Sequence, residues 1–292
     1  MGILLRMDIK ESGVPIRVPA TANLMIDSVD RTSGSPDNFL INKKQSILNG
    51  FFNRIGATEL VLEWFLPNVY NNLATGTNYT TISVNVTGAP ANPYQINFPT
   101  GSYTMENLLD TLVAEMTALA LGSTFTIVQQ PGGVFIHSNA ATFAFAASPL
   151  QGLMGLPVGG ANVNQFVGTR YPDLRPIRYL DFVSSKLTYN QELKDDSTDN
   201  QNRSVLARWY MAWDNPTQYD GYGFPILMGY TPFVLRRIYN PPKQIRWDPR
   251  QPVGQLDFQV YTDQGNLLSQ VFQPNVVNVY FQWLMTLQAS EN

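Results

Sequence analysis

One histidine and no cysteine limit the chemistry that this chain of 292 residues can perform. His137 is the single imidazole base, and it ends the apolar stretch Val134-Phe135-Ile136, which is typical of a strand. The lack of cysteine excludes disulfides, thiolate zinc ligands and cysteine nucleophiles. Because one histidine cannot form a transition-metal site alone, we interpret His137 as a structural residue and assign it no catalytic or metal-binding role.

The glycines and serines carry no phosphate-binding or nucleophile signature. No Gly-x-Ser-x-Gly occurs, and no glycine is followed by lysine, which excludes a P-loop. Gly221-Tyr222-Gly223 begins like a dinucleotide fingerprint, but Ile226 stands where the third glycine belongs. Carboxylate pairs for glycoside hydrolysis need not be near in sequence, and nothing here selects a pair. We therefore expect neither an enzyme nor a bound cofactor.

An acidic stretch has part of the spacing of a calcium loop. Its carboxylates are Glu192, Asp195, Asp196 and Asp199. Asp195-x-Ser197-x-Asp199 matches the first three ligand positions, yet Asn200 replaces the required glycine and Leu206 stands where the bidentate glutamate belongs. The pattern favours a solvated polar loop, and a looser divalent-ion site near Asp195–Asp199 stays open.

Residues 236–250 hold five basic residues and one acid, with Tyr239 and Trp247 interleaved. Such a segment would suit phosphates or an acidic partner. The alternative is a connection through Pro241-Pro242 whose arginine stems pack on apolar surface. Because 19 basic residues face 22 acidic ones, for a net charge of −3, we favour the second interpretation and do not expect nucleic-acid binding.

Alternating apolar and polar residues predict the strands that position these side chains. Residues 253–263 show the period of two most clearly, with Leu256, Phe258 and Val260 on one face. After a turn at Gly265, residues 267–272 are expected as the second strand of a hairpin. Further strands are expected at 23–28, 58–66, 80–86, 94–98, 124–129, 134–137, 143–146, 177–187, 205–213, 233–239 and 276–285.

One helix interrupts the strands. Apolar residues recur every three or four positions from Thr104, a suitable cap, to Leu121, and Gly122 ends the run. We predict an all-β fold, a single jelly-roll sandwich with a small α+β insertion. The expected parts are an N-terminal arm (1–22), the first part of the jelly roll (23–98), the inserted α+β subdomain (99–160) and the remaining strands (161–292).

The composition bears on the surface. Charged residues make up 14%, against roughly 25% in average soluble proteins. A surface so short of charge suits a protein covered by neighbours, and a merely β-rich soluble protein is the alternative. No stretch approaches the ~18 apolar residues of a membrane span.

Several short motifs resemble viral capsid proteins. Residues 25–32, 35–39 and 60–71 look like their N-terminal region. Pro99 to Thr104 before the helix, two strands, and Leu153 to Pro157 are together similar to an insertion in minor capsid (penton) proteins of virophages and Polinton-like DNA viruses. Lys186-Leu187-Thr188 with Leu193-Lys194-Asp195 also suits that group.

The resemblance implies a structural protein of the virion, assembled inside the host cell, with five copies closing each icosahedral vertex. Its partners would be further copies in heterologous contact, neighbouring major capsid proteins and, at the insertion, host or fibre proteins. Two other functions stay open on the sequence. Jelly rolls also serve as carbohydrate-binding or adhesion modules, and a phage-type tail or baseplate protein is related.

Overall fold

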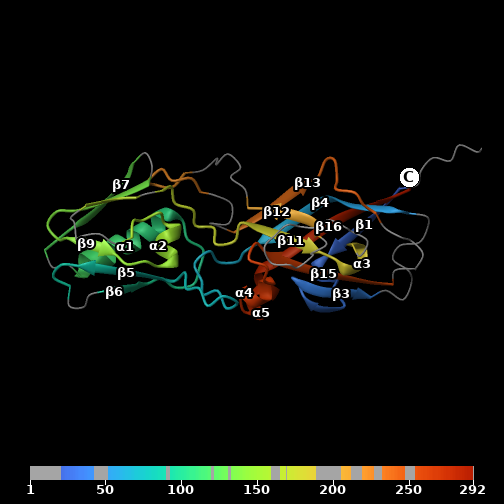
Figure 1. The fold of residues 1–292 in the computed structure, drawn as a ribbon, viewed down its shortest axis with the longest axis horizontal. Coiled ribbons are helices and arrows are strands. Elements are labelled where there is room, and N and C mark those ends of the chain that lie inside the picture. Colours follow the sequence, from blue (N-terminus) through green and yellow to red (C-terminus); the bar gives the residue numbers. More distant parts are fainter. Residues whose placement is uncertain are drawn as a thin grey trace, which may run out of the picture.

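The computed structural model describes residues 21–42, 52–89, 93–119, 122–130, 133–158, 165–168, 170–188, 205–211, 219–226, 232–246 and 254–291. The molecule is elongated and has two lobes, each with an apolar core of its own (Figure 1). We call them the sandwich and the second lobe; the C-terminus lies at the far end of the sandwich. The expected arm falls outside the described residues except for Thr21 and Ala22, which begin the first strand.

Ten antiparallel strands form the two sheets of the sandwich, five in each. The first sheet has the order β1-β16-β4-β13, with β14 also on β4; its strands are β1 (Thr21–Asp27), β16 (Phe281–Ser290), β4 (Arg54–Trp64), β13 (Phe233–Ile238) and β14 (Ile245–Arg246). The second sheet has the order β12-β11-β15-β3-β2; its strands are β12 (Val205–Tyr210), β11 (Tyr179–Val183), β15 (Gln255–Thr262), β3 (Asn38–Asn42) and β2 (Ser33–Ser35). When the short β2 and β14 are left out, the eight remaining strands can be lettered B to I in chain order. The first sheet then has the order B-I-D-G and the second has the order C-H-E-F. This is the jelly-roll order, and it confirms the predicted fold class.

Trp283 joins the two sheets at the centre of the sandwich. Its ring on β16 lies 5.4, 5.1 and 5.6 Å from the rings of Phe39, Phe182 and Phe258, which belong to the second sheet. The indole nitrogen donates a hydrogen bond to the Pro36 carbonyl oxygen at 2.8 Å. The inner faces of the two sheets interlock because every second residue of β15 and β16 is buried.

Three of the expected strands are wrong in part. Residues 267–272 contain the helix α4 (Leu268–Val271), and 276–285 begins in the helix α5 (Pro274–Tyr280) before entering β16. A short apolar run does not distinguish strand from helix, and both edges of β15 are already paired with β3 and β11. The strand expected at 177–187 ends at Val183, and α3 (Ser185–Thr188) follows.

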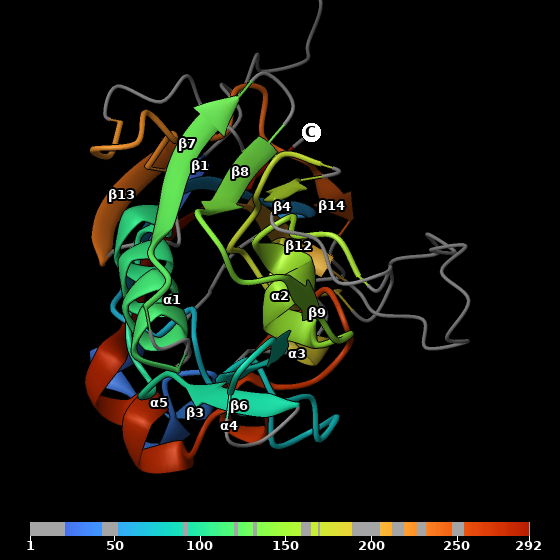
Figure 2. The same cartoon turned by 90° about the vertical axis from the view of Figure 1, so that its left-hand side faces the viewer.

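The second lobe packs two small sheets around two helices. The sheets have the orders β6-β5-β9 and β10-β8-β7. Their strands are β5 (Thr81–Val86), β6 (Tyr94–Asn97), β7 (Phe125–Gln130), β8 (Gly133–Ser138), β9 (Phe143–Phe145) and β10 (Gln165–Val167), and the helices are α1 (Met105–Leu119) and α2 (Pro149–Leu153). Figure 2 shows α1 and α2 between β7–β8 and β5–β6. The predicted helix is confirmed, and the Thr104 hydroxyl accepts a hydrogen bond from the Asn107 amide at 3.3 Å. No described helix is long and apolar enough to cross a bilayer.

The second lobe is larger than the insertion expected at 99–160. Its core includes Ile82 and Val84 of β5, together with Val69, Leu174 and Phe224. The strands at 81–97, expected in the jelly roll, therefore belong to the other lobe. A period of two predicts a strand but does not tell which sheet it joins. We propose residues 69–174 as the unit inserted between β4 and β11.

Candidate functional site

His137 is the next-to-last residue of β8 and is half-buried. Its ring stacks on that of Phe135 at 6.3 Å, and its cross-strand neighbours are Thr126 and Gln165. In the described part of the chain, no three histidine or carboxylate side chains gather where they could hold a metal ion. The contacts of His137 are therefore those of a residue within a β-sheet.

The glycines at 221 and 223 lie in a turn that is bound to the start of α1. Asp220 accepts hydrogen bonds from the amides of Glu106, Tyr222 and Phe224 at 3.0, 3.1 and 2.8 Å. In return the Glu106 carboxylate accepts from the Gly221 amide at 2.9 Å. Burial raises the pKa of Asp220 above its ordinary value, although these hydrogen bonds oppose the shift. The turn holds the second lobe against the connection between β12 and β13.

The acidic stretch that matches part of a calcium loop lies outside the described residues, Asp195 to Asp199 included. Leu206, the residue in place of the last ligand, is buried in the core of the sandwich. A ligand at that position would have to leave the core, so a loop of the EF-hand type does not fit β12.

The basic segment is divided by its neighbours. Arg236 forms an ion pair with Glu59, and the Arg237 guanidinium lies 5.1 Å above the Trp209 ring. Both belong to β13, the edge strand of the first sheet. Arg246 lies apart on β14, directly opposite Arg54 of β4, and both side chains are exposed. Trp247 and residues 248–250 lie outside the described residues.

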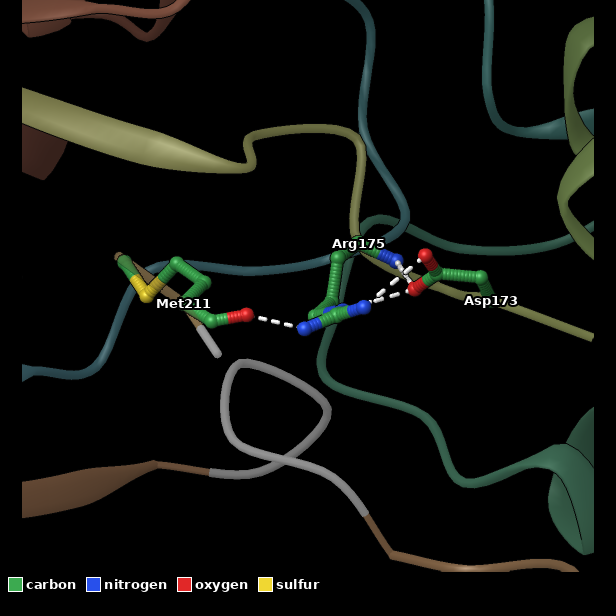
Figure 3. Close-up of polar contacts among 3 residues, drawn as sticks. All are labelled: Asp173, Arg175 and Met211. Atoms are coloured by element: carbon green, nitrogen blue, oxygen red, sulfur yellow. Dashed lines mark hydrogen bonds and ion pairs between the residues drawn. The ribbon is translucent and has the colours of Figure 1, made fainter. Parts of the chain in front are cut away.

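A buried arginine connects the lobes where the chain returns from the second lobe to the sandwich (Figure 3). Arg175 is 8% exposed, and its Nε and Nη2 donate to the two carboxylate oxygens of Asp173 at 2.7 and 3.0 Å. Its Nη1 donates to the Met211 carbonyl oxygen at the end of β12. The Asp173 amide donates to the Leu153 carbonyl oxygen of α2 at 2.8 Å. One continuous set of polar contacts thus runs from the second lobe to the sandwich.

Asn68 makes a second connection on the outgoing chain. Its side-chain amide exchanges two hydrogen bonds of 2.9 Å with the backbone of Tyr103, just before α1. Asn68 and Arg175 line a pocket of ≈ 10 Å³ between the lobes, together with Trp64, Pro67, Pro176, Ile177 and Met211. That volume holds about one water molecule and is far below the several hundred Å³ of a small-molecule site.

Two buried polar atoms next to this junction have no hydrogen-bond partner among the described residues. The Tyr70 hydroxyl and the Asp263 Oδ1 are buried without a hydrogen bond. Burial raises the pKa of both groups, and the like charge of Asp181 raises that of Asp263 further, against the lowering effect of Arg178. The protonated form of Asp263 is therefore favoured by folding.

The outer face of the first sheet exposes large apolar side chains. Met25 on β1 is 66% exposed, and Val234 and Ile238 on β13 are 55% and 63% exposed. Phe65 and Tyr280 are exposed where β4 and α5 meet at the end near the second lobe. β13 pairs only with β4 in the described structure, so its other edge presents backbone groups for pairing.

The sequence analysis missed two pairs of residues, one at the junction and one exposed on the sandwich. Asp173 and Arg175 are two residues apart between Pro172 and Pro176, a spacing that gives no sign of burial. Arg54 and Arg246 are brought together by the pairing of β4 with β14, which no local pattern contains.

No protein-family model and no curated protein matches the chain. Among solved structures, the crystal structure of the mavirus penton protein is similar at a TM-score of 0.53 and 11% identity, over 94% of this chain and 100% of that one. A chain in the cryo-EM structure of the Sputnik virophage gives a TM-score of 0.49 at 11% identity, over 93% and 97%. The first likeness shows that the chain has the fold of the mavirus penton protein along nearly its whole length.

Proposed function

We propose that this chain is a structural capsid protein, a penton whose five copies close an icosahedral vertex of a virion beside other capsid proteins. The observation that carries the proposal is the fold. This chain, a jelly roll interrupted after β4 by a second lobe, is similar in fold to the mavirus penton protein over the whole of that chain. The resemblance of the sequence motifs to penton proteins supports the same role.

The exposed face of the first sheet supports assembly. In a closed ring, one surface of each copy meets a different surface of the next copy. Val234 and Ile238 on the open edge of β13 are the apolar side chains that such a contact would cover. Their neighbours Arg236 and Glu59 form an ion pair with each other, so these two charges offset each other on the face that the contact would cover.

The junction supports a fixed shape. Arg175, Asn68 and the turn at Asp220 attach the second lobe at three points. A rigid two-lobed subunit is what a closed ring requires, because each copy must place its neighbour at the same angle. We propose that the sandwiches form the ring and that the second lobes extend from one side of it.

Native mass spectrometry of the purified full chain tests this proposal. We expect a species of five times the chain mass. Val234→Asp should dissociate it, since a charge would enter the contact. Val158→Asp is the matched control: Val158 in the second lobe is 58% exposed, against 55% for Val234, and its replacement should leave the species intact. A monomer at all concentrations, or equal sensitivity to both variants, would contradict the proposal.

A further inference from the structure

Two exposed arginines lie side by side at the end of the sandwich that is far from the second lobe. Arg54 begins β4 and Arg246 ends β14, and the pairing places them directly opposite each other. Their chain neighbours Ile55 and Ile245 are buried in the core, so both arginines point to the outer face of the first sheet. The C-terminal end of β16, which pairs with Arg54 at Ser290, marks this end in Figure 1.

This arrangement is unfavourable for the isolated subunit. Like charges directly opposite each other in a sheet repel. Neither guanidinium has an ion pair or a side-chain hydrogen bond to any residue that the structure describes, whereas Arg175, Arg208 and Arg236 each have a carboxylate partner. Of the two carboxylates of β4 on the same face, Glu59 is held by Arg236 and Glu63 lies further along the strand, opposite Val234. Among the described residues, the pair therefore presents two positive charges without a carboxylate partner.

The same row of the sheet continues with hydroxyl groups. Arg54 pairs with Ser290 of β16, and Ser290 pairs with Thr21 of β1. Four side chains thus follow each other across four strands, a distance of about 14 Å at the ordinary strand spacing. The next row has Gln288 and Asn23 beside Gly56. The backbone of Lys243 passes over Gly56, because a Cβ on Gly56 would lie 2.7 Å from the Lys243 carbonyl oxygen.

Charge is unevenly distributed along the molecule. Residues 66–174, which contain the inserted unit, have four carboxylates and one basic residue, Arg170. Their carboxylates are Glu106, Asp110, Glu115 and Asp173. The opposite end carries Arg54 and Arg246, which have no carboxylate partner among the described residues, with the exposed Lys243 close by and one carboxylate, Glu291, directly after Ser290. A polyanion would therefore approach the sandwich end and avoid the second lobe.

We propose that the row Arg246–Arg54–Ser290–Thr21 binds the phosphate backbone of nucleic acid. Arginine, serine, threonine, asparagine and glutamine are the side chains that contact phosphates without reading sequence. The row contains no apolar side chain to enter a lipid surface, which favours a nucleic acid over an anionic membrane. The inference goes beyond the proposed capsid function. It rests on that function only in the choice of ligand, because the function determines which polymer the protein would meet.

The test measures binding of the full chain to fluorescently labelled double-stranded DNA of mixed sequence, by anisotropy, over a series from about 50 to about 200 mM salt. Arg54→Gln/Arg246→Gln should reduce the slope of log affinity against log salt by about 1.8, from about 0.9 per phosphate contact. The corresponding loss is roughly 60-fold in affinity at 0.1 M salt. Arg54→Lys/Arg246→Lys keeps both charges and should keep the slope.

The charge-matched control is Arg170→Gln/Lys186→Gln, which removes two exposed basic residues elsewhere and should leave the slope unchanged. If the first double variant loses its thermal transition, the single variant Arg246→Gln, with about half the effect, replaces it. The proposal is overturned if the parent does not bind DNA, if the control loses as much slope, or if the arginine pair is needed only for binding to phosphatidylserine vesicles. Native mass of the same samples reports ring formation separately, so a failure of this inference is distinct from a failure of the proposed function.

Discussion

The two lobes bury their cores in opposite ways. In the sandwich, residues from the two ends of the chain lie together: β1 pairs with β16 along seven residues, and Trp283 contacts Phe39. In the second lobe, most contacts join residues within 69–174, and α1 fills the core from one continuous helix. The sandwich therefore forms only when the whole chain is in place, whereas the second lobe is a local unit. Changes within such a local unit therefore need not alter the jelly roll that surrounds it.

The largest effect is expected from breaking the centre of the sandwich. Trp283→Ala should lower the free energy of unfolding by about 3–5 kcal/mol, because it leaves a cavity between the sheets and a Pro36 carbonyl without its donor. Denaturant unfolding measures the loss. Hydrogen exchange should rise in both sheets, whereas Phe143→Ala in the second lobe should raise exchange in that lobe alone. Uniform exchange in both variants would remove the distinction between the lobes.

A smaller effect is expected at the junction. Arg175→Met removes the donor of three hydrogen bonds, two of them to a carboxylate, and should lower the free energy of unfolding by about 2 kcal/mol. The two lobes should then melt in separate calorimetric transitions. Arg170→Met, at an exposed position, is the control and should keep a single transition. A single transition in both variants would show that the other attachments suffice.

A buried carboxyl gives a pH-dependent effect. Because burial raises the pKa of Asp263, the folded state binds its proton more tightly than the unfolded chain does. Stability is therefore lost as the pH rises through the raised pKa, and Asp263→Asn should stabilise the protein at pH 7 by about 1 kcal/mol and less near pH 4. Thermal melting across that range is the measurement, with exposed Asp30→Asn as the control. A destabilised Asn variant at pH 7 would show that the charged carboxylate is held by a favourable contact.

The smallest effect on stability is expected on the outer face. Phe65→Ser should change the free energy of unfolding of the isolated subunit by less than about 0.5 kcal/mol, because the side chain is already 41% exposed. The same change should weaken a ring whose contact includes this end of the sheet. A large loss of stability in the monomer would place Phe65 in the fold and not in the contact.

The strands and the helix could be predicted from the sequence wherever burial is periodic. β4, β15 and α1 follow from alternation or from apolar residues every three or four positions. The expectation of strand at α4 and α5 is wrong, since runs of four to seven residues that mix apolar and polar side chains fit either structure. The lobe to which β5 and β6 belong could not be predicted, because period alone does not choose a sheet partner.

The candidate site was harder to predict from the sequence. The sequence predicts no functional role for His137 or Gly221, and it carries no signal for the attachment of Gly221 to α1 through Glu106. Arg246 was noticed within a basic segment, but its neighbour Arg54 is 192 positions away and became visible only through strand pairing. Contacts between strands that are distant in the sequence are set by the topology of the sheet. These contacts decide which side chains lie together on its surface.

The most direct test of the capsid function is a cryo-EM reconstruction of the assembled protein. We expect five upright sandwiches side by side, with the edge of β13 covered by the next copy and the second lobes on one side of the ring. A ring of another number, or copies joined through their second lobes with β13 left open, would contradict it.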